Sequence, residues 1–166
     1  INVKPTSGED EILIAGSNGK VIRFEEDEVR PMGRTASGVR GFNTDGGTVV
    51  GVAVSHEGKY LLSVSENGYG KRSEIDEYRK TNRGSKGVKT INVTTKTGSL
   101  VAVRAVNGDE DAMIVTDKGI IIRIALDHVG VYGRNTQGVK LINVADDEMV
   151  TKVAVVAKNE EEQSEE

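Results

Sequence analysis

Three short segments of this 166-residue chain combine cations with glycines at the same spacing. They read GRTASGVR at Gly33–Arg40, NRGSKGVK at Asn82–Lys89 and GRNTQGVK at Gly133–Lys140. In each segment an arginine is followed four residues later by glycine, then by valine and a second cation. Arginine pairs bidentately with phosphate, and glycine lets backbone N–H groups approach an anion closely. The pattern predicts a surface that binds a polyanion.

Cations recur at and around these segments, in the same part of each repeat. Equivalent positions of a repeat lie on equivalent faces, so the cations should form a basic stripe along one rim. A stripe of this kind fits the regularly spaced phosphates of duplex DNA, with binding that is independent of sequence and dependent on salt. The candidate DNA-binding residues are Arg30, Arg34, Arg40, Arg79, Lys80, Arg83, Lys86, Lys89, Arg134 and Lys140.

A structural interpretation of the same residues stays open. Gly38, Gly87 and Gly138 could serve turns, while the cations neutralise nearby acids such as Glu74 and Glu77. Three further arginines recur inside expected strands, where a role in pairing neighbouring units is at least as plausible as ligand binding. They are Arg23, Arg72 and Arg123.

The residue types that catalysis or metal binding requires do not recur in the sequence. The two histidines, His56 and His128, lie in different repeats, and the chain has no cysteine. Gly68–Ser73 lacks the spacing of a phosphate-binding Walker loop, and Asn107–Met113 lacks that of a calcium loop. We therefore expect no catalytic residue, no metal site and no cofactor in this chain.

The elements that must position the cations form a threefold repeat of about 50 residues. Apolar runs flank turns at Gly19, Gly68 and Gly119, and these glycines are 49 and 51 residues apart. Asn-Gly between two such runs predicts a hairpin with a type I′ turn, so these glycines are expected to be turn residues. A second strand pair is expected in each repeat. It joins Gly38–Phe42 to Val49–Val54, Val88–Val93 to Leu100–Val106, and Val139–Val144 to Val150–Val156.

Four short strands in a unit of this length predict an all-β, propeller-like array of blades. The three blades should span residues 5–54, 55–106 and 107–158, and residues 1–4 should be the terminal strand of a preceding, truncated blade. One turn of helix is expected at Ile75–Tyr78.

The net charge of −4 is unevenly distributed. Five of the 26 acidic residues lie in the last seven positions, and the remaining 21 nearly balance the 22 lysines and arginines. Residues 159–166 should be a disordered acidic tail. The lack of cysteine, of a signal peptide and of a long apolar run favours a cytoplasmic protein without a membrane partner.

The repeats resemble a known family. Gly19–Gly41, Glu66–Val93 and Val129–Val150 are similar, in this order, to the final three units of the C-terminal domain of bacterial DNA gyrase A. The resemblance implies part of a six-bladed β-pinwheel, in which neighbouring blades exchange strands. It also implies a role in bending duplex DNA around a basic rim, which supports ATP-dependent negative supercoiling by the whole type II topoisomerase.

The resemblance places the enzyme's chemistry outside this chain. ATP and Mg would be used elsewhere, and the partners would be the rest of gyrase A together with gyrase B in a heterotetramer. The family's signature heptad, which joins glutamine with basic residues and glycines, has its nearest match at Thr81–Gly87, where Arg83, Gly84, Lys86 and Gly87 agree. None of the four tyrosines is expected to cleave DNA: Tyr60, Tyr69, Tyr78 and Tyr132.

Two alternatives remain at this point. The equivalent C-terminal domain of topoisomerase IV is built from similar blades. A propeller-like protein-interaction scaffold would have a basic rim by coincidence and would bind partners through an apolar groove.

Overall fold

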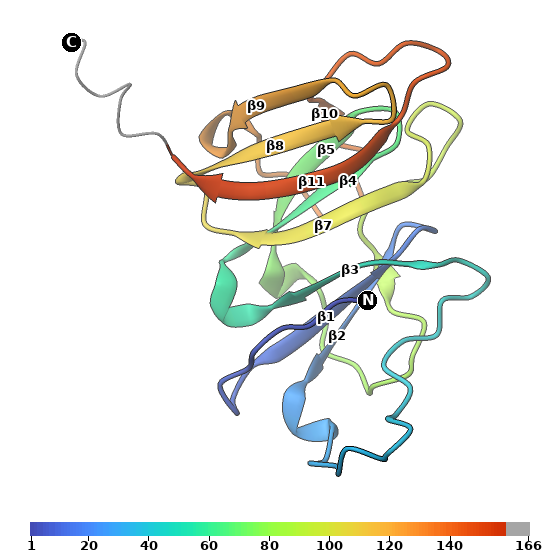
Figure 1. The fold of residues 1–166 in the computed structure, drawn as a ribbon, viewed down its shortest axis with the longest axis vertical. Helices are drawn as coiled ribbons and strands as arrows, with labels where there is room; N and C mark the ends of the chain where they lie inside the picture. The colour runs from blue at the N-terminus through green and yellow to red at the C-terminus, as the bar shows by residue number, and fades with distance from the viewer. Residues whose placement is uncertain (159–166) are drawn as a thin grey trace.

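The computed structural model describes residues 1–158 as three antiparallel β-sheets that follow one another along the long axis of the molecule (Figure 1). The all-β fold class and the three blades predicted from the repeats are confirmed. The acidic segment 159–166, for which we expect disorder, lies outside the described residues. Within residues 1–158 no helix is long and apolar enough to span a bilayer.

The first sheet has the strand order β3-β1-β2-β6. Its strands are β1 (Glu11–Gly16), β2 (Lys20–Glu25), β3 (Val49–Val54) and β6 (Val88–Lys89). Two single-turn 3-10 helices follow β2 and β3, namely η1 (Glu26–Glu28) and η2 (Ser55–Glu57).

The second sheet repeats this arrangement with the order β10-β5-β4-β7. Its strands are β4 (Tyr60–Ser65), β5 (Tyr69–Glu74), β7 (Leu100–Val106) and β10 (Val139–Lys140). The 3-10 helix η3 (Ile75–Glu77) follows β5, where one turn of helix is expected from the sequence.

The third sheet has three strands in the order β11-β8-β9. They are β8 (Glu110–Thr116), β9 (Ile121–Ala125) and β11 (Val150–Ala157), and the 3-10 helix η4 (Leu126–His128) follows β9. Among residues 1–158, no strand pairs with the outer edge of β9.

The second strand pair expected in each repeat is wrong. β6 pairs with β2 of the preceding repeat, with Val21 opposite Val88, and β10 pairs in the same way with β5. Gly38–Phe42 forms no strand. An apolar alternation shows which face of a strand is buried but does not show its partner, so the sequence alone could not exclude the wrong pairing. The observed pairing agrees with the strand exchange that the family resemblance implies.

The hairpins are present, but the predicted type I′ turn is wrong. A type I′ turn needs positive φ at both central residues, whereas Gly19, with φ 77°, is the only residue of the Ser17–Gly19 loop with positive φ. The Gly19 amide donates to the Gly16 carbonyl, which fits a three-residue loop ending in a left-handed glycine. Gly68 and Gly119 have the same role in their repeats.

The apolar core lies between consecutive sheets. Leu13, Leu61 and Val103 belong to one buried cluster between the first and second sheets. A second cluster joins the second and third sheets. Strands β3, β7 and β11 lie next to one another (Figure 1), while β6 and β10 form the opposite edges of their sheets. The cation-bearing segments 82–89 and 133–140 therefore lie on the outer rim.

Residues 1–4 form no strand in this structure. Lys4 is held by an ion pair of 2.5 Å with Glu57 of η2. The assignment of these residues to a preceding blade, and the unit boundaries proposed from the repeats, stay predictions.

Candidate nucleic-acid interface

The repeated glycines let the backbones of neighbouring repeats approach closely. A Cβ at Gly87 would lie within 3.0 Å of the Val21 carbonyl oxygen, and one at Gly138 would lie equally close to the Gly70 carbonyl oxygen. Both glycines also have positive φ. These contacts favour a structural role for Gly87 and Gly138, although the role is close approach to the preceding sheet.

Arg83 and Arg134 of the same segments form hydrogen bonds across the junction between their own repeat and the preceding one. The amide N–H of Arg83 donates to Glu28 Oε2, and that of Arg134 donates to Glu77 Oε2, both at 2.7 Å. Each guanidinium also donates to a carbonyl of the preceding repeat, from Arg83 Nη1 to Arg40 and from Arg134 Nη1 to Lys89. Both residues are half-buried.

Two of the strand arginines are buried between repeats. Arg23 is 7% exposed, and its Nη1 donates to the carbonyls of Ile75 and Tyr78 at 3.0 and 2.9 Å. Arg72 Nε donates to the Val129 carbonyl at 2.8 Å. These contacts favour the interpretation that Arg23 and Arg72 pair neighbouring blades.

The first junction, between repeats one and two, pairs several of its cations with carboxylates. Lys80 contacts Glu11 and Glu25, both at 2.5 Å, and these hydrogen bonds raise the pKa of Lys80. Lys86 lies 2.9 Å from Asp45, and the hydrogen bond from Lys86 is the main cause of the lowered pKa of Asp45. Lys80 and Lys86, both predicted DNA contacts, are thus partly neutralised within the protein.

The second junction, between repeats two and three, contains a buried lysine that sequence reasoning missed. Lys71 Nζ donates to the Gly133 and Arg134 carbonyls at 2.6 Å and to Thr136 Oγ1 at 3.2 Å. Burial lowers the pKa of Lys71 to about 8. Lys71 supports the loop that carries Arg134. In the repeat alignment it occupies the position of Ile22, and a lysine at an otherwise apolar core position was the available signal.

Four other cations of the second junction make no ion pair within residues 1–158. Arg79 and Lys89 line a hollow of about 350 Å³ together with Arg134. Lys96 and Lys140 lie over the Tyr69 ring, at 5.4 and 5.7 Å from its centre, beside a second hollow of about 400 Å³. These four lysines and arginines are exposed. Lys96 was absent from the sequence-based candidates because its position does not recur as a cation in the repeats.

The remaining candidates lie in the first repeat, away from the second junction. Arg30, Arg34 and Arg40 are exposed and make no ion pair with any residue that the structure describes. They lie in the long segment between η1 and β3, and the Arg40 carbonyl in it accepts the hydrogen bond from Arg83 at the first junction. The structure thus brings together only part of the predicted stripe.

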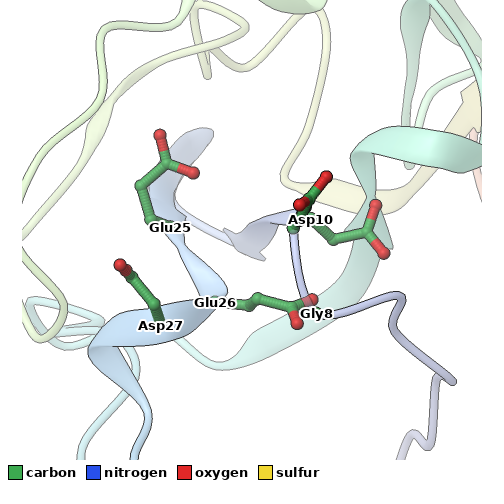
Figure 2. A pocket seen from close by; sticks show the side chains of 6 residues that line it. Gly8, Asp10, Glu25, Glu26 and Asp27 are labelled. Carbon is green, nitrogen blue, oxygen red and sulfur yellow. The ribbon is translucent and has the colours of Figure 1, made fainter.

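An acidic hollow of about 210 Å³ lies elsewhere in the first repeat. Figure 2 shows the carboxylates of Asp10, Glu25, Glu26 and Asp27 around it. Asp10 is already engaged, since its Oδ2 lies 2.8 Å from His56 Nδ1. No group of three or more metal-ligating side chains is found among the described residues. The acidic lining of this hollow does not suit a phosphate ligand.

A family model described as "DNA gyrase C-terminal domain, beta-propeller" matches residues 10–56, 59–107 and 110–157. The chain belongs to this family. The three matches correspond to the three repeats and confirm the family resemblance seen in the sequence. The DNA gyrase A of Ureaplasma parvum serovar 3 is 46% identical over 155 residues, which cover 93% of this chain and 18% of that protein. This gyrase C-terminal domain chain therefore spans about a fifth of the length of such relatives.

Solved structures agree with this assignment. A structure titled "Structure of DNA gyrase A C-terminal domain" has a TM-score of 0.83 and 27% identity, covering 91% of this chain and 52% of its own. The C-terminal domain of DNA topoisomerase IV gives a TM-score of 0.84 at 21% identity, covering 92% and 48%. The second likeness shows the fold alone, so the gyrase assignment rests on the family match and on the closer sequence relatives.

Proposed function

We propose that this gyrase A C-terminal domain binds duplex DNA through its outer rim without sequence preference and helps to bend it. The observation that supports the proposal is a group of exposed cations at the second junction that make no ion pair among residues 1–158. Arg79 and Lys89 line one hollow there with Arg134 and a single acid, Glu77, and Lys140 lies beside the other hollow.

The chemistry of these groups favours phosphate contacts over base recognition. Arginine and lysine neutralise phosphates and release counterions, which supplies affinity without sequence information. The cations extend from one repeat to the next, so one duplex could contact several of them along a curved path. Arg30, Arg34 and Arg40 would extend the contact in the first repeat.

The whole enzyme would use this bending for supercoiling. By analogy with its DNA gyrase A relatives, the domain would act with the rest of gyrase A and with gyrase B in the bacterial cytoplasm. DNA cleavage and ATP hydrolysis would occur in other parts of that type II topoisomerase.

Fluorescence anisotropy with two duplexes of equal length and unrelated sequence would test the proposal across a salt series. Each phosphate contact contributes about −0.9 to the slope of log K against log salt. We expect equal affinities for the two duplexes and a slope of about −3 or steeper, corresponding to at least three contacts. A folded domain that fails to bind at low salt, or that prefers one sequence strongly, would contradict it.

A further inference from the structure

Tyr69 is an aromatic side chain outside the apolar core. Tyr78 is fully buried in one apolar cluster and Tyr60 packs against another, whereas Tyr69 is in none of the clusters that residues 1–158 form. It is partly exposed at the start of β5, at the position where the first repeat has Lys20. Its ring lines the hollow of about 400 Å³ at the second junction. Packing of the core therefore does not explain a tyrosine at this position.

The pairing of β5 with β10 fixes Lys140 beside this ring. Tyr69 lies directly opposite Lys140, and the Leu141 amide donates to the Gly68 carbonyl at 2.8 Å. This pattern makes Tyr69 and Lys140 a non-hydrogen-bonded pair, in which Cα atoms lie about 4.5 Å apart and the side chains are closest. Accordingly, Lys140 Nζ lies 5.7 Å from the ring centre.

Lys96 approaches the same ring from a loop that is held by hydrogen bonds. Asn67 Nδ2 donates to the carbonyls of Thr95 and Lys96, at 3.1 and 3.0 Å. Thr97 is fully buried, and its Oγ1 donates to the Asn92 carbonyl at 3.0 Å. The loop thus presents Lys96 Nζ at 5.4 Å from the ring centre.

An aromatic ring between two exposed lysines combines the two groups that bind single-stranded DNA. Aromatic rings stack on unpaired bases, while cations contact the strand's phosphates. A cation over an exposed ring is held weakly, so each lysine can move from the ring to a phosphate of an incoming strand. Asp146 is the one acid that lines this hollow in the described part of the chain.

We propose that the Tyr69 hollow binds an unpaired base of single-stranded DNA, which stacks on Tyr69 while Lys96 and Lys140 contact the phosphates on either side. Both walls of the hollow come from the second and third repeats, so the site is complete within residues 1–158. It goes beyond the duplex binding proposed above, because the bases of a duplex already stack on one another. The competing explanation is that Tyr69 only positions the two lysines, in which case its loss would weaken strands with and without bases equally.

Two single strands of equal charge test the proposal by fluorescence anisotropy at one salt concentration. One is an oligothymidylate of about 12 nucleotides, and the other has the same number of phosphates but only abasic sites. We expect the oligothymidylate to bind about tenfold more tightly, in line with the stacking of one base on an aromatic ring. A folded chain that binds the two strands equally, or binds neither, would overturn the proposal.

Substitutions assign the difference to the ring. Tyr69→Leu should lower the affinity for the oligothymidylate to that for the abasic strand and leave the latter within about twofold of its wild-type value, whereas Tyr69→Phe should keep the difference. Tyr132→Leu, which removes a tyrosine that is 41% exposed outside this hollow, is the matched control and should also keep it. Equal weakening of both strands by Tyr69→Leu would mean that Tyr69 only positions the lysines, and the proposal would be wrong. Circular dichroism checks that each variant is folded, and the comparison of strands on the wild type decides even if Tyr69→Leu does not fold.

Duplex binding by the same variants separates this conclusion from the proposed function. Tyr69→Leu should leave duplex affinity within about twofold of the wild type, because phosphate contacts alone carry it. A wild type that binds the oligothymidylate but no duplex would contradict the proposed function and leave the base site intact. A loss of duplex affinity as large as the loss for the oligothymidylate would contradict base stacking at Tyr69.

Discussion

The two inter-repeat junctions share one backbone geometry but differ in their charges. Both use a glycine in close contact with the preceding sheet and an arginine bonded to a carbonyl of that repeat. At the first junction, Arg23 and Lys80 share the carboxylate of Glu11. At the second, the equivalent of Glu11 is Tyr60, whose ring lies 5.2 Å from the Arg72 guanidinium carbon.

The difference indicates which residues maintain the fold and which can be adapted to a ligand. Backbone contacts and glycines hold each junction, so the surrounding side chains can change without altering its geometry. Lys71 in place of Ile22 and Tyr69 in place of Lys20 are two such changes. The result is a first junction whose Lys80 and Lys86 are partly neutralised by carboxylates, and a second junction whose exposed cations make no ion pair among residues 1–158.

The largest effect on stability should come from Arg23→Met, with Arg123→Met as the matched control. Arg23 is buried and bonds two carbonyls of the next repeat, and removing a buried partner costs about 3–5 kcal/mol. Arg123 lies on β9, whose outer edge has no partner strand among residues 1–158, and its side chain is 35% exposed. An ion pair at such an exposed site is worth up to about 1 kcal/mol. Urea unfolding of both variants measures the difference. Equal losses of unfolding free energy in the two variants would mean that burial of Arg23 between repeats does not explain its contribution to stability.

The next largest effect should come from Gly87→Ala. A methyl group there meets the Val21 carbonyl and also requires a left-handed conformation, which together cost about 3 kcal/mol. Gly38→Ala has the same backbone requirement but no clash within the described residues, so it should cost about 1 kcal/mol. The denaturant midpoints of the two variants measure this difference in stability. A Gly38→Ala loss as large as that of Gly87→Ala would argue against close approach as the reason for the glycine.

A smaller effect on stability, which depends on pH, is expected at the second junction, because Lys71 there takes the place of Ile22 at the first. The folded protein releases the Lys71 proton near pH 8, whereas the unfolded chain keeps it up to its ordinary pKa of 10.5. Between these values the unfolded state binds more protons, so the contribution of Lys71 to the free energy of unfolding rises with pH. The stability of the wild type relative to Lys71→Met should therefore increase from pH 8 to pH 10. A constant difference would mean that the Lys71 pKa is not lowered by burial.

The sequence predicts much of the fold because the repeat fixes equivalent positions. Gly19 and Gly68 identified the hairpins, and the periodicity indicated three blades. The sequence could not show which strands pair with each other, since the alternating pattern around Val88 is the same whether it pairs with its own repeat or with the preceding one. The site was predicted less completely. Lys80 is distant in sequence from Glu11, so its neutralisation depends on tertiary contacts, and Lys71 becomes a buried loop support only when two repeats pack.

The most direct test compares DNA binding by two double variants that remove the same total charge. Arg79→Gln with Lys140→Gln removes exposed cations of the second junction, and Lys80→Gln with Lys86→Gln removes cations that are paired with acids. The first pair should make the salt slope shallower by up to about 1.8, at about 0.9 for each lost phosphate contact, and the second by less than about 0.9. Equal changes, or a larger change for the second pair, would contradict the account in which the second junction carries the DNA contact.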